Sequence, residues 1–287
     1  MKKLANIILP FIILTILSSC EQETNVVFPP YEPKIVVNGL ISDQEPSLVV
    51  LSQSTASQDT GFIPFITRAS VQVLSSNGSL YDNLTYDAFE GGFVGSKAAL
   101  QNAEYQIRVN YEDQEVRGTT RLTPGVPINT FTYQDSVGLD SSGFPLGELT
   151  LEFTDLAGQD NYYRINMYYY DDIRQSFQVF DLNEDAFLNA RAEETEKGFV
   201  FDDLSFNGRS QTISVPVPFG FTSPTAPYKF LVRLESLNND LAQYEKSREL
   251  YFNSIGGLFS EPIDLYSNIR GGLGIFGGSS LSTDTLR

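Results

Sequence analysis

The chain has no histidine, no tryptophan and a single cysteine, Cys20, among its 287 residues. Without histidine, the catalytic pairs in which an imidazole activates serine or cysteine are excluded, as is an imidazole ligand for zinc or haem. A P-loop is excluded because no Gly-Lys-Ser or Gly-Lys-Thr run occurs. The residue inventory therefore favours a protein that is not an enzyme.

Basic residues are also scarce. The chain has 19 Lys and Arg against 36 Asp and Glu, which gives a formal net charge of −17. Nucleic acid is excluded as a partner, because phosphate binding needs clustered Lys and Arg that displace counterions. An acidic surface also repels anionic membranes. Any attachment to a membrane must therefore be covalent or inserted.

Long apolar runs are confined to the first twenty residues. Two lysines precede the run Ile7–Leu17, which ends in the sequence LSSC with Cys20 last. This pattern predicts a signal peptide over residues 1–19. Its end resembles a bacterial lipobox, in which the cysteine carries acyl lipid such as palmitate and becomes the new N-terminus. We expect lipidation of Cys20 to anchor the chain, with residues 20–33 as a flexible tether.

The rest of the chain consists of short β-rich segments separated by turn residues. Those between residues 34 and 124 are typical of an immunoglobulin-like β-sandwich. Two prolines and a glycine follow, and residues 125–287 are expected to form a second, larger, antiparallel β-sandwich-like domain. Apolar residues at helical spacing predict a helix near residues 238–254. A second short helix is expected within residues 183–197, so the fold class is all-β with one or two short helices.

A glycine-rich segment near the end matches the dinucleotide-binding fingerprint as a string, Gly272-x-Gly274-x-x-Gly277. A working site needs a strand before it, a helix after it and an acidic residue about twenty positions further on. Only ten residues follow Gly277, so a nucleotide is excluded. We expect instead a strand whose glycines allow a bulge or a close backbone approach.

The segment YYRINMYYY predicts a strand with two different faces. Tyr163, Ile165, Met167 and Tyr169 share one face, which we assign to the core. The other face is the candidate ligand-facing surface for a sugar, a peptide or a protein. The open alternative is that a neighbouring helix or loop covers it. This face comprises Tyr162, Arg164, Asn166, Tyr168 and Tyr170.

Acidic residues gather between residues 171 and 203. Asp181-x-Asn183-x-Asp185 opens like an EF-hand loop, but alanines stand where that loop requires its glycine and its final glutamate. An EF-hand is excluded, and these three residues remain candidates for a looser calcium site, with a solvated acidic surface as the alternative. A carboxylate pair for glycan hydrolysis can be drawn from the same region.

Several segments resemble one family of lipoproteins. With the LSSC motif, the segments KIVVNGLISD, NYYRI, FDDLSFNG and above all EPIDLYSNIRGGLGIFGG are similar to the domain-of-unknown-function 4249 family of Bacteroidota outer-membrane lipoproteins. The resemblance implies an outer-membrane location, with surface exposure left open. It also implies association with a TonB-dependent transporter, and neither catalytic residues nor a cofactor beyond the lipid on Cys20.

These observations lead to three hypotheses about function. The first is a non-enzymatic, membrane-anchored accessory or ligand-binding partner of a TonB-dependent transporter in nutrient uptake. The second is a surface adhesin or a scaffold of the cell envelope. The third is a glycan-acting hydrolase, which requires two acidic side chains that converge in a pocket.

Overall fold

The computed structural model describes residues 31–56, 61–171, 174–180, 192–195, 198–217, 229–254 and 263–286. Residues Pro33–Arg287 form one compact unit. The predicted signal peptide, Cys20 and most of the predicted tether lie outside the described residues. Within the described ranges, none of the helical segments has the length and apolar character needed to cross a bilayer.

Two sheets account for the strands of the described residues. The smaller sheet consists of β14 (Ser210–Val217), β9 (Pro145–Thr154) and β8 (Ile128–Leu139), in that spatial order. In chain order, the strands of the larger sheet are β1 (Ile35–Ser42), β2 (Pro46–Gln53), β3 (Ser70–Ser75), β4 (Leu80–Asp87), β5 (Gly92–Ala98), β6 (Glu104–Tyr111), β7 (Gln114–Arg121), β10 (Tyr162–Asp171), β11 (Ser176–Phe180), β12 (Ala192–Thr195), β13 (Gly198–Asp202), β15 (Phe230–Leu237), β16 (Ile269–Arg270) and β17 (Leu273–Leu286). Their spatial order is β12-β13-β10-β15-β17-β1-β2-β5-β4-β3-β6-β7-β16, and β11 pairs with β10.

Strands β1 to β7 form a two-layered sandwich. One layer holds β1, β2 and β5, the other holds β3, β6 and β7, and β4 joins them by pairing with both β3 and β5. Buried and more exposed side chains alternate along β1, β2, β6 and β7, because one face of each of these strands is buried. In β6, Tyr105, Ile107 and Val109 point into the core, while the residues between them are partly exposed. The sandwich expected for this part of the chain is confirmed.

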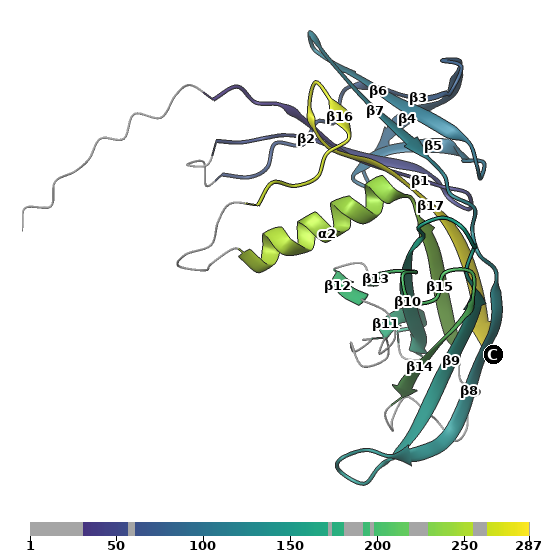
Figure 1. The fold of residues 1–287 in the computed structure, drawn as a ribbon. Coiled ribbons are helices and arrows are strands. Elements are labelled where there is room, and N and C mark those ends of the chain that lie inside the picture. Colours follow the sequence, from purple (N-terminus) through teal and green to yellow (C-terminus); the bar gives the residue numbers. More distant parts are fainter. Residues whose placement is uncertain are drawn as a thin grey trace, which may run out of the picture. The chain divides into compact units, whose positions relative to one another are not determined.

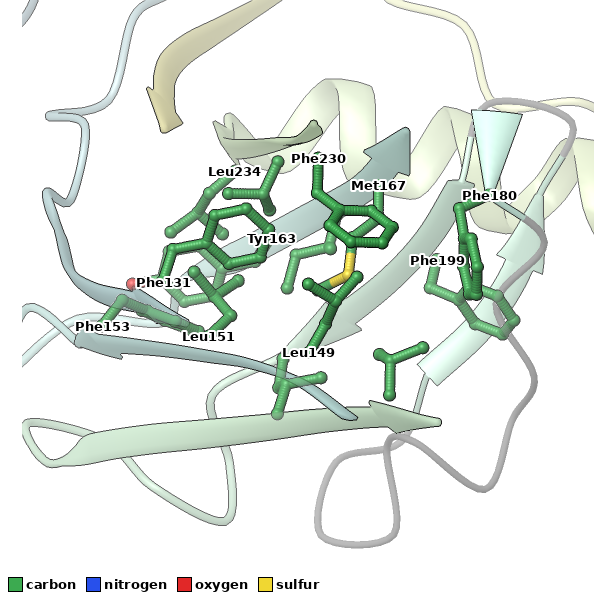
Figure 2. Packing of buried hydrophobic residues seen from close by; sticks show 14 of the residues in the cluster. Phe131, Leu149, Leu151, Phe153, Tyr163, Met167, Phe180, Phe199, Phe230 and Leu234 are labelled. Atoms are coloured by element: carbon green, nitrogen blue, oxygen red, sulfur yellow. The ribbon is translucent and has the colours of Figure 1, made fainter. Parts of the chain in front are cut away.

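A second core lies between the smaller sheet and strands β10, β13 and β15 of the larger one (Figure 2). It is rich in aromatic rings that meet edge-on or tilted. The ring centroids of Phe153 and Tyr163 are 5.0 Å apart, and those of Tyr163 and Phe201 are 5.7 Å apart. The all-β class and the sandwich-like second part are thus confirmed.

The last described strand contributes to both cores. β17 pairs in parallel with β1, from Val36 opposite Leu273 to Ser42 opposite Ser279, and antiparallel with β15 (Figure 1). Phe276 belongs to the N-terminal core, while Leu286 packs against the second core. Leu122 belongs to the N-terminal core and Val126 to the second core, so the chain passes from one core to the other near the predicted boundary. The division into two separate domains stays a prediction.

One α-helix is present in the described residues, α2 (Asn239–Ser254), at the place that the sequence predicts. Its N-cap is Asn238, whose Oδ1 accepts a hydrogen bond from the Leu241 N–H at 3.0 Å. Leu241 and Ala242 pack against Val200 of β13 and Ile275 of β17.

The structure corrects one expectation about helical segments and limits another. Tyr251 and Phe252, which share a helical face with Leu241 and Tyr244 by their spacing, are 37% and 53% exposed. The buried residues of α2 all lie in its first half, because its second half extends past the strands that it covers (Figure 1). Ala192–Thr195, expected in a short helix, instead forms strand β12, whose backbone pairs with β13. Residues 183–191 of that expected helix lie outside the described residues.

The glycine-rich segment forms the turn between β16 and β17 and the first part of β17 itself, and its glycines allow the close backbone approach that we expected. Gly274 has φ +100°, and a Cβ there would collide with the carbonyl oxygen of Val37 on the paired strand. A Cβ at Gly277 would lie 2.9 Å from Cδ1 of Leu241. The bare backbone therefore lets β17 fit between β1 and the helix.

Two asparagines hold this segment in place. Asn268 donates from Nδ2 to the Phe276 carbonyl and accepts from the Phe276 N–H, both at 2.9 Å. The N–H of Asn238 donates to the Gly278 carbonyl at 3.0 Å, and Asn238 Nδ2 donates to Thr120 Oγ1 at 2.8 Å. The segment that carries the strongest family resemblance therefore has a structural role: it joins β7, β17 and the start of α2.

Candidate functional site

Strand β10 has the two faces that its sequence predicts. Tyr163, Ile165 and Met167 are fully buried in the second core, where Figure 2 shows Tyr163 and Met167 among the other core side chains. Tyr169 is partly buried against the same core. The assignment of this face to the core is confirmed.

The opposite face of β10 is largely covered. Tyr162 packs in the apolar cluster beneath α2, and Lys246 Nζ lies 5.0 Å from the centroid of its ring. Lys229 Nζ lies 4.5 Å from the ring centroid of Tyr170. Asn166 and Tyr168 are partly exposed, whereas Arg164 is buried at 5% exposure. The predicted surface is thus shared between contacts with the helix and a smaller accessible region.

Arg164 forms a buried ion-pair network with two glutamates. Its guanidinium binds both carboxylate oxygens of Glu235 on β15, with Nη2 2.6 Å from Oε2 and Nε 3.2 Å from Oε1. Its Nη1 lies 3.2 Å from Glu245 Oε1 on α2. Arg248 Nη2 lies 2.9 Å from the other oxygen of Glu245, in a geometry that makes no hydrogen bond. The charges of the two arginines and the two glutamates therefore balance where α2 packs on the sheet.

The bidentate pair of Arg164 and Glu235 shifts the pKa of each partner in the direction that favours its charged form. Burial alone would raise the pKa of Glu235, but the Arg164 guanidinium outweighs it and holds that pKa below its ordinary value. Burial alone would lower the pKa of Arg164, but Glu235 and Glu245 outweigh it and raise that pKa. Both groups of the bidentate pair therefore stay ionised.

We expect this pair to make stability depend on acid pH. A carboxyl group with a lowered folded-state pKa contributes fully above its unfolded-state pKa, about 4.3 for Glu, and loses this contribution as the pH falls through the folded-state value. The free energy of unfolding should therefore fall below about pH 4, and less steeply in a Glu235→Gln variant. Urea unfolding between about pH 3 and pH 6 measures this. The control Glu90→Gln, in an exposed turn, should keep the wild-type slope; equal slopes in all three proteins would contradict the expectation.

A cleft of about 200 Å³ opens beside the network. Strands β1, β2, β10, β15 and β17 form its walls. Its lining residues are Leu40, Ile41, Ser42, Glu45, Pro46, Leu48, Arg164, Arg233, Glu235, Ser279 and Leu281. Of the predicted ligand-facing residues, Arg164 lines it directly. Burial raises the pKa of Tyr168, and the charges of Arg233 and Glu235 also act on its hydroxyl.

An exposed ion pair belongs to the same cleft. Arg233 Nη2 lies 3.0 Å from Glu45 Oε1, and the two side chains are 30% and 55% exposed. Such a pair is worth at most about 1 kcal/mol, so a bound polar group can replace either partner. The cleft thus combines a fixed, charge-balanced base with an exchangeable pair and apolar walls from Leu40, Leu48 and Leu281.

Sequence reasoning did not find Glu235, Glu245, Arg233 or Glu45. A signal existed in the segment FLVRLESL: its apolar residues alternate with Arg233 and Glu235, so both charges share the face opposite the core. Glu245 and Glu45 have no comparable local signal, because their contacts come from other elements.

A second pair of buried carboxylates supports a turn. Asp155 accepts hydrogen bonds from the Tyr163 hydroxyl and, at 2.6 Å, from the Gly208 N–H. Asp203 accepts from Asn161 Nδ2 at 3.1 Å, and its burial raises its pKa. Neither residue lines the cleft. Through these hydrogen bonds, Asp155 and Asp203 connect the turn after β13 to the start of β10.

The calcium candidates Asp181, Asn183 and Asp185 and the lipidation site Cys20 lie outside the described residues. Among the residues that the structure does describe, no group of three or more Asp, Glu or Cys side chains is placed to hold a metal ion.

These observations define an all-β protein with two cores, a helix across one sheet face and a small cleft beside a buried ion-pair network. The chain belongs to the family described as domain of unknown function (DUF4249), whose model matches residues 21–285. No curated protein matches it. Among solved structures, bovine butyrophilin is similar with 10% identity and a TM-score of 0.21, over 74% of this chain and 95% of that one.

Proposed function

We propose that this protein is an outer-membrane lipoprotein, anchored through Cys20, which binds a ligand or partner without catalysing a reaction. In this proposal it acts as an accessory to a TonB-dependent transporter in nutrient uptake. The anchor is supported by the basic start, the apolar run and the LSSC sequence before the tether. The transporter is supported by the family resemblance of the glycine-rich segment and its surroundings.

The observation that carries the binding role is the cleft beside Arg164. Its buried charges are already paired, so its base is held in one arrangement before anything binds. The Arg233–Glu45 pair at its exposed side offers both signs of charge, and the leucines offer apolar contact. This combination suits a small polar group with an apolar part, including one side chain of a partner protein.

The same cleft gives little support to a hydrolase. A general acid for glycan cleavage needs a raised pKa, whereas the pKa of Glu235, the buried carboxylate of the cleft, is lowered. Asp203, whose pKa is raised, does not line the cleft and instead accepts a hydrogen bond from Asn161 that holds a turn. A binding role therefore agrees better with these residues than acid catalysis does.

Affinity capture from solubilised outer membranes tests the proposal. The wild-type chain should recover a TonB-dependent receptor. A Leu48→Lys variant, which places a charge in the cleft wall, should recover at least about tenfold less, because a lysine is costly to bury there. The control Leu139→Lys changes a leucine that is 68% exposed on the β8–β9 hairpin and should capture as the wild type does.

Two results would contradict the proposal. If the wild-type chain captures envelope polymer and no receptor, the adhesin or scaffold hypothesis gains support. If both leucine variants capture the receptor as well as the wild type does, the receptor binds the protein at a surface other than the cleft.

A further inference from the structure

The loop after β2 carries a group of exposed apolar side chains. Phe62 is fully exposed, and Ile63 and Phe65 are 60% and 63% exposed. All three lie within the six residues Gly61–Ile66, which contain no charged residue. Single exposed apolar residues are ordinary on protein surfaces, but three large ones in one short loop mark a contact surface.

Backbone hydrogen bonds hold the segment Pro64–Ile66 of this loop against β2. The N–H of Gln53 donates to the Pro64 carbonyl, and the N–H of Ile66 donates to the Leu51 carbonyl, both at 2.9 Å. Ile66 is buried at 4% exposure in the N-terminal core. Phe65 is therefore presented to the outside by a backbone segment that is already fixed, and Phe62 and Ile63 directly precede it, which limits the backbone entropy lost when the three side chains become buried in a contact.

The loop lies beside the point where the chain enters the fold. Gln53, at the end of β2, has neighbours on both sides. It pairs with Ile35 of β1 on one side, and on the other its N–H donates a hydrogen bond to the Pro64 carbonyl of the loop. The backbone of the loop is thus two strand spacings, about 10 Å, from the start of β1. Lys34 is bonded to Ser54 at this same end of β2.

The length of the preceding segment places this end of the fold within reach of a lipid anchor. Residues 20–33 span at most about 50 Å when fully extended. A chain attached to a bilayer through Cys20 therefore keeps Lys34, and the loop next to it, within reach of the lipid surface. An acidic protein gains little from charge attraction to that surface, but an uncharged apolar loop can enter it.

We propose that Phe62, Ile63 and Phe65 form a membrane-contact loop that inserts into the lipid interface beside the N-terminal tether. This proposal rests on the lipid anchor proposed above. Aromatic and aliphatic side chains partition into the region between headgroups and acyl chains. The contact fixes which side of the folded part faces the membrane, which a lipid anchor on Cys20 alone does not do.

A single tryptophan tests this contact, because the natural chain has none. The full-length, lipidated Phe62→Trp variant is placed in phosphatidylcholine vesicles whose acyl chains carry bromine, which quenches tryptophan in the bilayer. Its fluorescence should shift to the blue and be quenched severalfold. The matched control is Leu100→Trp, at a position 65% exposed in the turn between β5 and β6, at the opposite end of β2, which should stay red-shifted and unquenched.

Vesicle flotation of the same samples reports the anchor separately. The lipidated chain should float with the vesicles, and a Cys20→Ala chain should float at least about tenfold less, because it loses its acyl chains. A chain that floats while the tryptophan of the Phe62→Trp variant stays red-shifted and unquenched keeps the anchor and overturns the membrane-contact loop. A chain that does not float and is not quenched overturns both.

Two further results would also overturn the loop. Equal quenching of the Phe62→Trp and Leu100→Trp variants means that the folded part adsorbs without a preferred side. A blue shift without bromine quenching, seen only when outer-membrane proteins are present, means that a protein partner covers the loop instead of lipid.

Discussion

Replacement of Arg164 by methionine is expected to lower the free energy of unfolding by about 3–5 kcal/mol. The substitution keeps much of the side-chain volume but leaves Glu235 without its bidentate partner and Glu245 without one of its two arginines. Glu235 and Glu245 are only 7% and 1% exposed, so water from the cleft replaces few of the lost contacts. The loss should therefore far exceed that of an exposed ion pair.

Urea unfolding of the variant and of a control measures this difference. The control is Arg117→Met, which removes the exposed Arg117–Glu115 pair on β7 and should cost at most about 1 kcal/mol. Adding Glu235→Gln to Arg164→Met removes one unpaired charge, so the double variant should lose less than the sum of the two single variants. Equal losses for Arg164→Met and Arg117→Met would show that the network is not closed to water.

Replacement of Gly274 by alanine is expected to destabilise the protein by at least about 2 kcal/mol. The new Cβ would meet the carbonyl oxygen of Val37, at a backbone φ of +100° that side chains rarely adopt. Relief requires β17 to move away from β1, which disturbs the parallel pairing along the whole strand.

Thermal or urea unfolding compares this variant with Gly138→Ala. Gly138 lies in the exposed β8–β9 hairpin, where an added Cβ meets nothing within 4 Å. That control should change the free energy of unfolding by less than about 0.5 kcal/mol. A Gly274→Ala variant as stable as the control would contradict the close approach of the two strands.

Local patterns predict much of this fold, because a strand buried on one face reveals itself by alternation. Tyr105, Ile107 and Val109 of β6, and Tyr163, Ile165 and Met167 of β10, are buried as their spacing indicates. Asn238 before an apolar helical pattern likewise marks the start of α2, which it caps. The same spacing rule fails for Tyr251 and Phe252, because it identifies a shared face without showing where the covering sheet ends.

The candidate site is less accessible to such reasoning. The face of β10 that includes Arg164 follows from alternation, but its burial depends on Glu235 and Glu245, which are 71 and 81 residues away in the chain. Nothing near Arg164 indicates that carboxylates from another strand and from a helix will surround it. The residues that line the cleft likewise come from strands near both ends of the described chain and from β10 in its middle. No short stretch of sequence therefore contains a pattern that reveals the cleft.

The sequence by itself determined the all-β class, the two faces of the main strands, the helix after β15 and the family, because each rests on local periodicity or on a contiguous motif. The tertiary structure alone decided that GGLGIFGG pairs in parallel with the first strand and that Arg164 is enclosed by carboxylates. It also decided that the apolar loop Gly61–Ile66 lies beside the chain's entry into the fold. The physical reason is that pairing between distant segments depends on how well their surfaces fit, which no short stretch of sequence contains.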